Sequence, residues 1–101
     1  MSADTIFALA TAPGRSGVAV VRLSGGKARE VGEQLCGPLE NARLAQLRKL
    51  RDSDGTLIDA ALVLRFEEGK SFTGEETVEF QCHGGNAVIA SLLRTLGTTV
   101  G

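Results

Sequence analysis

Residues 57–66 read LIDAALVLRF and directly follow the turn-forming sequence DSDGT at residues 52–56. This alternation has the period of a β-strand with one buried face, which we assign to every second residue: Ile58, Ala60, Leu62, Leu64 and Phe66. Asp54 and Gly55 suit the backbone angles of a tight reversal, so a hairpin is predicted. Its other arm is residues 44–51, which we interpret as an irregular edge strand, although the leucine spacing there also suits a helix.

Three more segments carry strand patterns. Residues 5–11 (TIFALAT) are short and apolar, and residues 18–24 (VAVVRLS) are rich in β-branched side chains. In residues 77–82 (TVEFQC) the alternation predicts Val78, Phe80 and Cys82 inward, with Thr77, Glu79 and Gln81 on the other face.

Two helices are predicted between and after these strands. The first follows Ser24 and two glycines, which we interpret as a cap and a loose turn, and ends near Cys36. The second begins with Asn86 as its cap and ends at Gly97. Their apolar stripes are Ala28, Val31, Gly32 and Leu35 in the first, and Ile89, Leu92, Leu93 and Leu96 in the second.

Together these elements predict an α+β fold with a mixed or antiparallel sheet and two helices. The length of 101 residues fits one domain over residues 1–101. Residues 98–101 (TTVG) are interpreted as the start of a further strand, so the domain is expected to be truncated at its C-terminal end.

Composition narrows the class of protein. Hydrophobic residues make up 43% and charged residues 23%, which is typical of a globular domain. Eleven basic residues against twelve acidic ones leave no broad positive field for nucleic acid. Two cysteines, with neither an export signal nor an apolar run long enough to span a bilayer, indicate reduced thiols in the cytoplasm and no membrane contact.

Several motifs are better interpreted as structural than as catalytic or ligand-binding sites. The SGGKA stretch at residues 24–28 lacks the spacing of a phosphate-binding loop. His83 with Cys36 and Cys82 lacks the paired spacing of a zinc site, so no metal ligand and no catalytic residue is assigned. The glycines at 84 and 85 favour chain reversal over an anion site. Four basic residues lie close together, and without aromatic residues between them they are interpreted as a solvent-exposed face rather than an RNA-binding surface: Arg43, Arg48, Lys49 and Arg51.

Arg22 and Glu79 are the candidate site residues. Each is a charge within an otherwise apolar strand, and such a charge must be exposed, paired or bound to a ligand. From the pattern alone, mutual pairing or exposure to water is as well supported as ligand binding.

Three segments carry a family resemblance: residues 4–25 (DTIFALATAPGRSGVAVVRLSG), residues 71–85 (SFTGEETVEFQCHGG) and the Asp-Gly hairpin between them. In this order they resemble the N-terminal domain of the tRNA-modification GTPases called MnmE or TrmE. Cys82 stands where the family pattern usually has glycine, which puts the tightness of that bend in question.

The resemblance implies a domain that binds a tetrahydrofolate derivative, 5-formyl- or methylene-tetrahydrofolate, as one-carbon donor and that pairs with a second copy. The implied fold is similar to half of the folate-binding domain of the glycine-cleavage T protein. Folate contacts carry over to Arg22 and Glu79. A third, basic contact would fall after Gly101.

The resemblance also implies functions of the whole protein. It would modify the wobble uridine of tRNA together with the FAD-dependent partner MnmG. GTP, magnesium and potassium would bind only a G domain, and neither this domain nor the helical domain is expected within these 101 residues. Two other interpretations stay open for the chain itself: a protein–protein interaction domain without a functional ligand pocket, and RNA recognition by residues 43–51.

Overall fold

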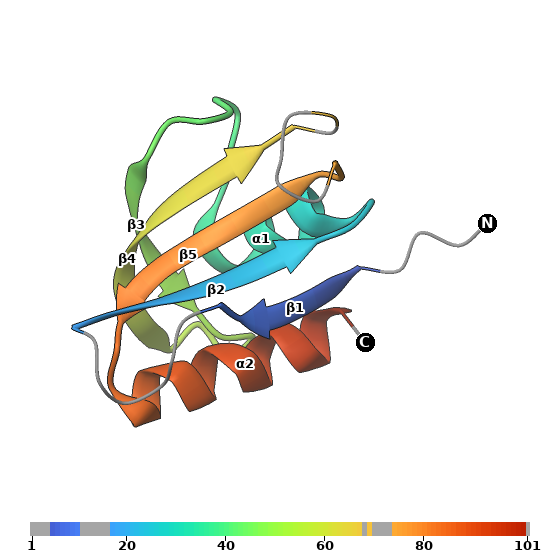
Figure 1. Ribbon diagram of the computed structural model, residues 1–101. Coiled ribbons are helices and arrows are strands. Elements are labelled where there is room, and N and C mark those ends of the chain that lie inside the picture. Colours follow the sequence, from blue (N-terminus) through green and yellow to red (C-terminus); the bar gives the residue numbers. More distant parts are fainter. Residues whose placement is uncertain (1–4, 11–16, 68, 70–73, 101) are drawn as a thin grey trace.

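A computed structural model describes all of the chain except residues 1–4, 11–16, 68, 70–73 and 101. Five strands form one sheet, and two helices pack against it (Figure 1). The elements are β1 (Ile6–Leu9), β2 (Val18–Ser24), α1 (Ala28–Cys36), β3 (Gln46–Arg51), β4 (Leu57–Phe66), β5 (Thr77–His83) and α2 (Asn86–Val100).

The strand order is β1-β2-β5-β4-β3, and every neighbouring pair is antiparallel. The α+β prediction is therefore confirmed, with a sheet that is antiparallel rather than mixed. The β2–β5 pair lies at the centre and joins segments that are far apart in the sequence (Figure 1). Residues 44–51 form the predicted edge strand over Gln46–Arg51.

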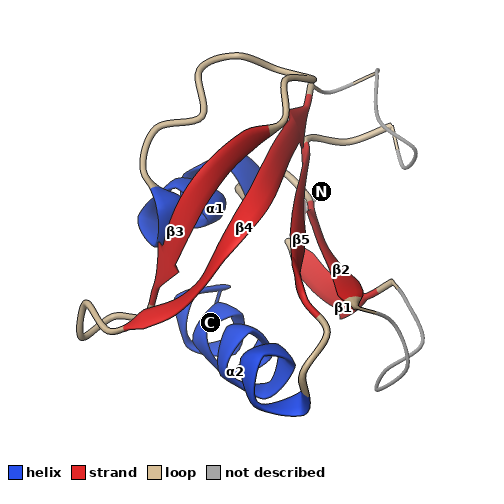
Figure 2. Ribbon diagram, turned by 90° about the vertical axis from the view of Figure 1, so that its left-hand side faces the viewer, coloured by secondary structure: helices blue, strands red, loops and turns tan. Residues whose placement is uncertain are grey.

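Both helices pack on the same face of the sheet, which Figure 2 shows with helices in blue and strands in red. One continuous core lies between them and the sheet, with Phe80, Leu23 and Leu92 fully buried at its centre. Helix α1 comes close to β5 at Gly32, where a Cβ atom would lie 3.2 Å from two methyl carbons of Val78. The opposite face of the sheet, here called the open face, is covered by neither helix.

The predicted face of β4 is wrong. Ala61 and Val63 are buried, whereas Ala60 is exposed and Leu62 is 41% exposed. Both faces of this strand are largely apolar, so alternation alone could not decide which one meets the helices. The set at Ala60, Leu62 and Leu64 therefore lies on the open face.

Both helix starts and one helix end differ from the prediction. The N-cap of α1 is Lys27 and not Ser24 as predicted. Ser24 is instead the last residue of β2. The carbonyl of Gly85 accepts from Ile89 N, so Asn86 is the first helical residue of α2 and not its cap.

Residues 98–100 continue α2 and do not start a strand. The hydroxyl groups of Thr98 and Thr99 both donate to the carbonyl of Thr95, which satisfies them within the helix. A glycine signal at Gly97 was therefore misleading, because a single glycine is tolerated inside a helix that is held by tertiary packing.

The hairpin between β3 and β4 is built by Asp52. Its Oδ1 atom accepts from the backbone N–H groups of Asp54 and Thr56, and Gly55 has a φ of +83°. That conformation favours glycine, which explains why the DG pair predicted the turn correctly.

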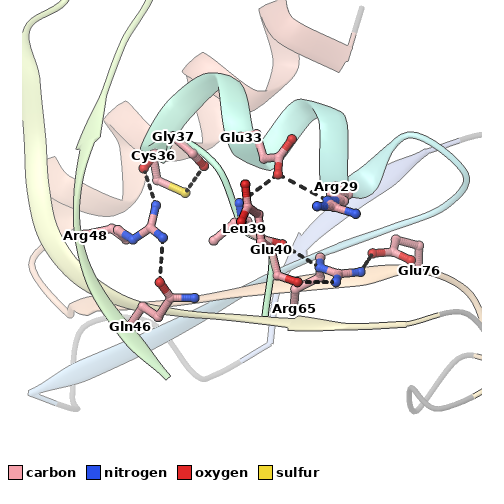
Figure 3. A network of polar contacts seen from close by, with 10 residues as sticks. All are labelled: Arg29, Glu33, Cys36, Gly37, Leu39, Glu40, Gln46, Arg48, Arg65 and Glu76. Carbon is pink, nitrogen blue, oxygen red and sulfur yellow. Dashed lines mark hydrogen bonds and ion pairs between the residues drawn. The ribbon is translucent and has the colours of Figure 1, made fainter. Parts of the chain in front are cut away.

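A polar network holds the connection from α1 to β3 against the sheet (Figure 3). Arg65 lies on the helix-covered face of β4 with 8% of its surface exposed, and it donates to the carbonyls of Leu39 and Glu40 and to Glu76. At the C-terminal end of α1, Glu33 accepts from Leu39 N at 2.7 Å. That bond, more than the nearby Arg29, lowers the pKa of Glu33.

Candidate functional site

Arg22 and Glu79 lie side by side on the open face at the centre of the sheet. The antiparallel register of β2 and β5 makes them direct cross-strand partners. Arg22 donates from Nε at 3.0 Å and from a terminal nitrogen at 2.8 Å, both to Oε2 of Glu79. The side chains are 33% and 17% exposed, respectively. The structure therefore brings the two predicted site residues together as an ion pair that solvent can still reach.

The pair is bordered by apolar side chains on both sides. Ala8 of β1 is the cross-strand partner of Arg22, and Leu64 of β4 is the partner of Glu79. One step further along the strands, Val20, Gln81 and Leu62 form the next row. Small-molecule sites commonly combine an apolar lining with a few polar groups that fix the orientation of the ligand.

A cavity of about 300 Å³ opens on the β1 side of Arg22. Its volume is at the lower end of the range for small-molecule sites. The lining residues are Ile6, Phe7, Ala8, Ala10, Arg22 and Ser24.

The carboxylate of Glu79 has unused acceptor capacity. Both bonds from Arg22 end on Oε2, and no described residue donates to Oε1. A carboxylate offers about four lone-pair positions, so Glu79 can keep Arg22 and still accept two N–H groups from a ligand. The arrangement can bind and orient a ligand that presents adjacent N–H donors.

His83 and Asp59 form a second polar pair that the sequence patterns did not indicate. Asp59 accepts from the backbone N–H of His83 at 2.8 Å, and its carboxylate also contacts Nδ1 at 2.8 Å. The cross-strand pairing of β4 with β5 ends at Leu62 and Gln81, so the Asp59 side chain holds the two strands together beyond that point. Asp59 was detectable by the same signal as Glu79, a charge within an apolar strand.

The two cysteines are structural. Cys82 is 2% exposed and faces the core, as predicted, and its Sγ lies 3.6 Å from the carbonyl oxygen of Ala19. Burial raises the pKa of Cys82, and it raises the pKa of Cys36 to about 11. Neither thiol is ionised at neutral pH, so neither is an activated nucleophile.

The remaining motifs have structural roles or lie outside the described residues. Arg48 donates to the carbonyl of Cys36, and Arg51 donates to that of Gly55. Lys27 N donates to Thr5 Oγ1 at the start of α1. Two parts of the family pattern, residues 13–16 and 71–73, lie outside the residues that the structure describes.

Comparison with known proteins decides the family. The sequence model described as "GTP-binding protein TrmE N-terminus" matches residues 5–100. The chain belongs to this family. The TrmE N-terminal resemblance predicted from the sequence is thereby confirmed.

The chain is similar to curated proteins named tRNA modification GTPase MnmE. It is 59% identical to the one from Dinoroseobacter shibae over 98 residues, which is 97% of this chain and 23% of that protein. It is 58% identical to the one from Caulobacter vibrioides over 93 residues, which is 92% of this chain and 21% of that protein. The chain therefore spans between a fifth and a quarter of the length of these TrmE-family relatives.

Proposed function

We propose that this chain is the folate-binding and self-pairing N-terminal domain of a tRNA-modification GTPase. The observation that carries the proposal is the Arg22–Glu79 pair, which lies on the open face with acceptor capacity left on Glu79. The domain would bind 5-formyl- or methylene-tetrahydrofolate. GTP hydrolysis, MnmG and tRNA would engage the whole protein.

The chemistry of a reduced pterin suits these residues. Its exocyclic amino group lies beside a ring N–H, so Glu79 can accept from both in a charge-assisted pair. Arg22 supplies fixed donors for the carbonyl or carboxylate oxygens of the ligand. The apolar neighbours Ala8 and Leu64 would contact the ring, which gains from leaving water.

Titration calorimetry with 5-formyl-tetrahydrofolate tests the proposal. A GTPase that carries this chain at its N-terminus is expected to bind one folate per domain. GTP omitted from the buffer should leave this binding in place, because the proposed contacts lie in this domain. Absence of heat at saturating folate, by a protein that still hydrolyses GTP, would overturn folate binding and leave the interaction-domain and RNA-recognition interpretations.

A specific observation also favours self-pairing. The open face carries an apolar strip of Leu47, Leu62 and Leu64, in which Leu47 is 71% exposed and is the cross-strand partner of Leu62. Exposed apolar side chains next to one another mark interaction surfaces, and a symmetric pair of copies could cover both strips at once.

Leu62→Lys is expected to weaken self-association at least about 10-fold, because two lysines would be brought into an apolar contact. Sedimentation velocity over a concentration series measures the change. Leu57→Lys is the matched control, since Leu57 is 50% exposed but is the first residue of β4 and lies outside the apolar strip. Equal effects of the two substitutions would mean that the apolar strip is not the contact.

The proposed location is the cytoplasm, where the two free thiols would remain reduced. None of the described helices is long and apolar enough to span a membrane.

A further inference from the structure

The outer edge of β1 carries backbone groups without partners. β1 forms one edge of the sheet (Figure 1), and among the described strands it pairs only with β2. The bond from Ala10 N to the carbonyl of Val20 fixes the alternation, so that Ala8 and Ala10 face β2. The N–H and C=O groups of Phe7 and Leu9 therefore point out of the sheet, and no residue in the described part of the chain bonds to them.

The two edges of the sheet differ in charge. β3, at the other edge, carries Arg48, Lys49 and Arg51, and cations on an edge strand disfavour pairing with a further strand. β1 reads IFAL and carries no charge, and its Ile6 is 63% exposed. An uncharged, apolar edge with unpaired backbone groups is a template for strand addition, so β1 is the edge at which this sheet can be extended.

Cavities lie on both sides of this edge. The cavity of about 300 Å³ beside Arg22 includes Ile6 and Ala8 and lies on the open face. A second cavity, of about 500 Å³, includes Ile6 together with Val31 of α1 and Val100 of α2, and so lies on the helix-covered face. Side chains of a strand point alternately to the two faces of a sheet, so a strand laid along β1 would place successive side chains in the two cavities.

We infer that an extended segment of the same polypeptide, from outside these 101 residues, pairs with β1 as a sixth strand of the sheet. Related proteins are long enough to supply such a segment, because the matched region is only 23% of the Dinoroseobacter shibae protein. The segment bonds to the outward backbone groups of Phe7 and Leu9. It places a bulky apolar side chain opposite Ala8 in the smaller cavity, and its neighbouring side chains reach the larger one, where Lys27 and Glu30 suit polar groups.

The small size of the edge favours a tethered strand over a separate protein. The four residues of β1 extend over about 14 Å, at about 3.4 Å per residue. Separate proteins that form a stable complex bury roughly 1,200 Å² or more, which so short a strand does not provide. A segment of the same polypeptide is present at an effective concentration in the millimolar range, so a few backbone hydrogen bonds and two filled cavities are sufficient to hold it.

Hydrogen–deuterium exchange of the whole GTPase, read by mass spectrometry of fragments that resolve single amides, tests the inference. The amides of Phe7 and Leu9 are expected to exchange at least about 100-fold more slowly than unprotected amides. Ala8 and Ala10 are the internal control, because their N–H groups face β2 and are protected in either case. Exchange of Phe7 and Leu9 at the unprotected rate, while the two control amides stay protected, overturns the inference.

Ile6→Lys gives the β1 edge the kind of charge that β3 already has. It is expected to speed exchange at Phe7 and Leu9 at least about 10-fold and to leave the two control amides unchanged, which also shows that β1 is still folded. Val18→Lys is the matched variant, since Val18 is 51% exposed but lies beyond the residues of β2 that pair with β1. Equal effects of the two substitutions contradict strand addition at β1.

A dilution series identifies the occupant of the edge. Protection of Phe7 and Leu9 by a tethered segment does not change with protein concentration. Protection that is lost on dilution assigns the edge to a second copy of the protein and overturns the inference of a tethered strand. Neither result bears on folate binding, which the calorimetric titration measures separately.

Discussion

Glu79→Gln is expected to lower the affinity for 5-formyl-tetrahydrofolate by about 100-fold, since two charge-assisted hydrogen bonds worth about 1.5 kcal/mol each would be lost. A glutamine side chain has the same shape, but one of its two ends donates and would face the N–H groups of the ligand. Titration calorimetry with the whole GTPase measures the effect.

The same variant separates ligand binding from a structural role of the ion pair. Arg22 and Glu79 are partly exposed, so losing their attraction should change the free energy of unfolding by less than about 1 kcal/mol. If Glu79→Gln and Arg22→Gln both lower the melting temperature while folate affinity stays the same, the pair serves only to join β2 to β5. That result would remove both residues from the proposed site.

Arg65→Met is expected to destabilise the domain by about 3 kcal/mol, because the charge of Glu76 and two backbone carbonyls would lose their donor in a largely buried position. This loss would be a large fraction of the stability of a small domain, which is typically about 5–15 kcal/mol. Urea unfolding of the 101-residue chain, followed by far-UV circular dichroism, measures it.

Arg29→Met is the matched control for Arg65. Arg29 pairs with Glu33 one turn along α1, and its side chain is 43% exposed, so the change should cost less than about 1 kcal/mol. Arg65→Lys keeps the charge but cannot donate to three acceptors in the same planar geometry, so an intermediate loss is expected. A similar small effect of Arg65→Met and Arg29→Met would show that the network in Figure 3 contributes little to stability.

The sequence was sufficient to predict most of the elements. β2 was predicted at its observed bounds, because β-branched residues run up to a glycine pair. The inward set of β5 was correct, since only one of its faces is continuously apolar. The face of β4 was not predictable from periodicity, because Arg65 occupies the core side and leucines occupy the open side.

The candidate site was predicted in part. Arg22 and Glu79 stood out as charges in apolar strands, but only the strand order brings them together, and pairing of β2 with β5 depends on contacts 57 residues apart. Arg65 and Asp59 carry the same signal and have structural roles, in the α1–β3 connection and at the β5–α2 bend. The signal thus identifies charges that need a partner, and the tertiary structure determines what that partner is.

Because both helices cover one side of the sheet, the proposed folate contacts and the apolar strip share the other side. Folate binding and self-association would then be thermodynamically linked. Bound folate would change the self-association constant by some factor, and self-association would change the folate affinity by the same factor. The consequence of the shared surface is that the two proposals can be tested together, by measuring self-association with and without 5-formyl-tetrahydrofolate.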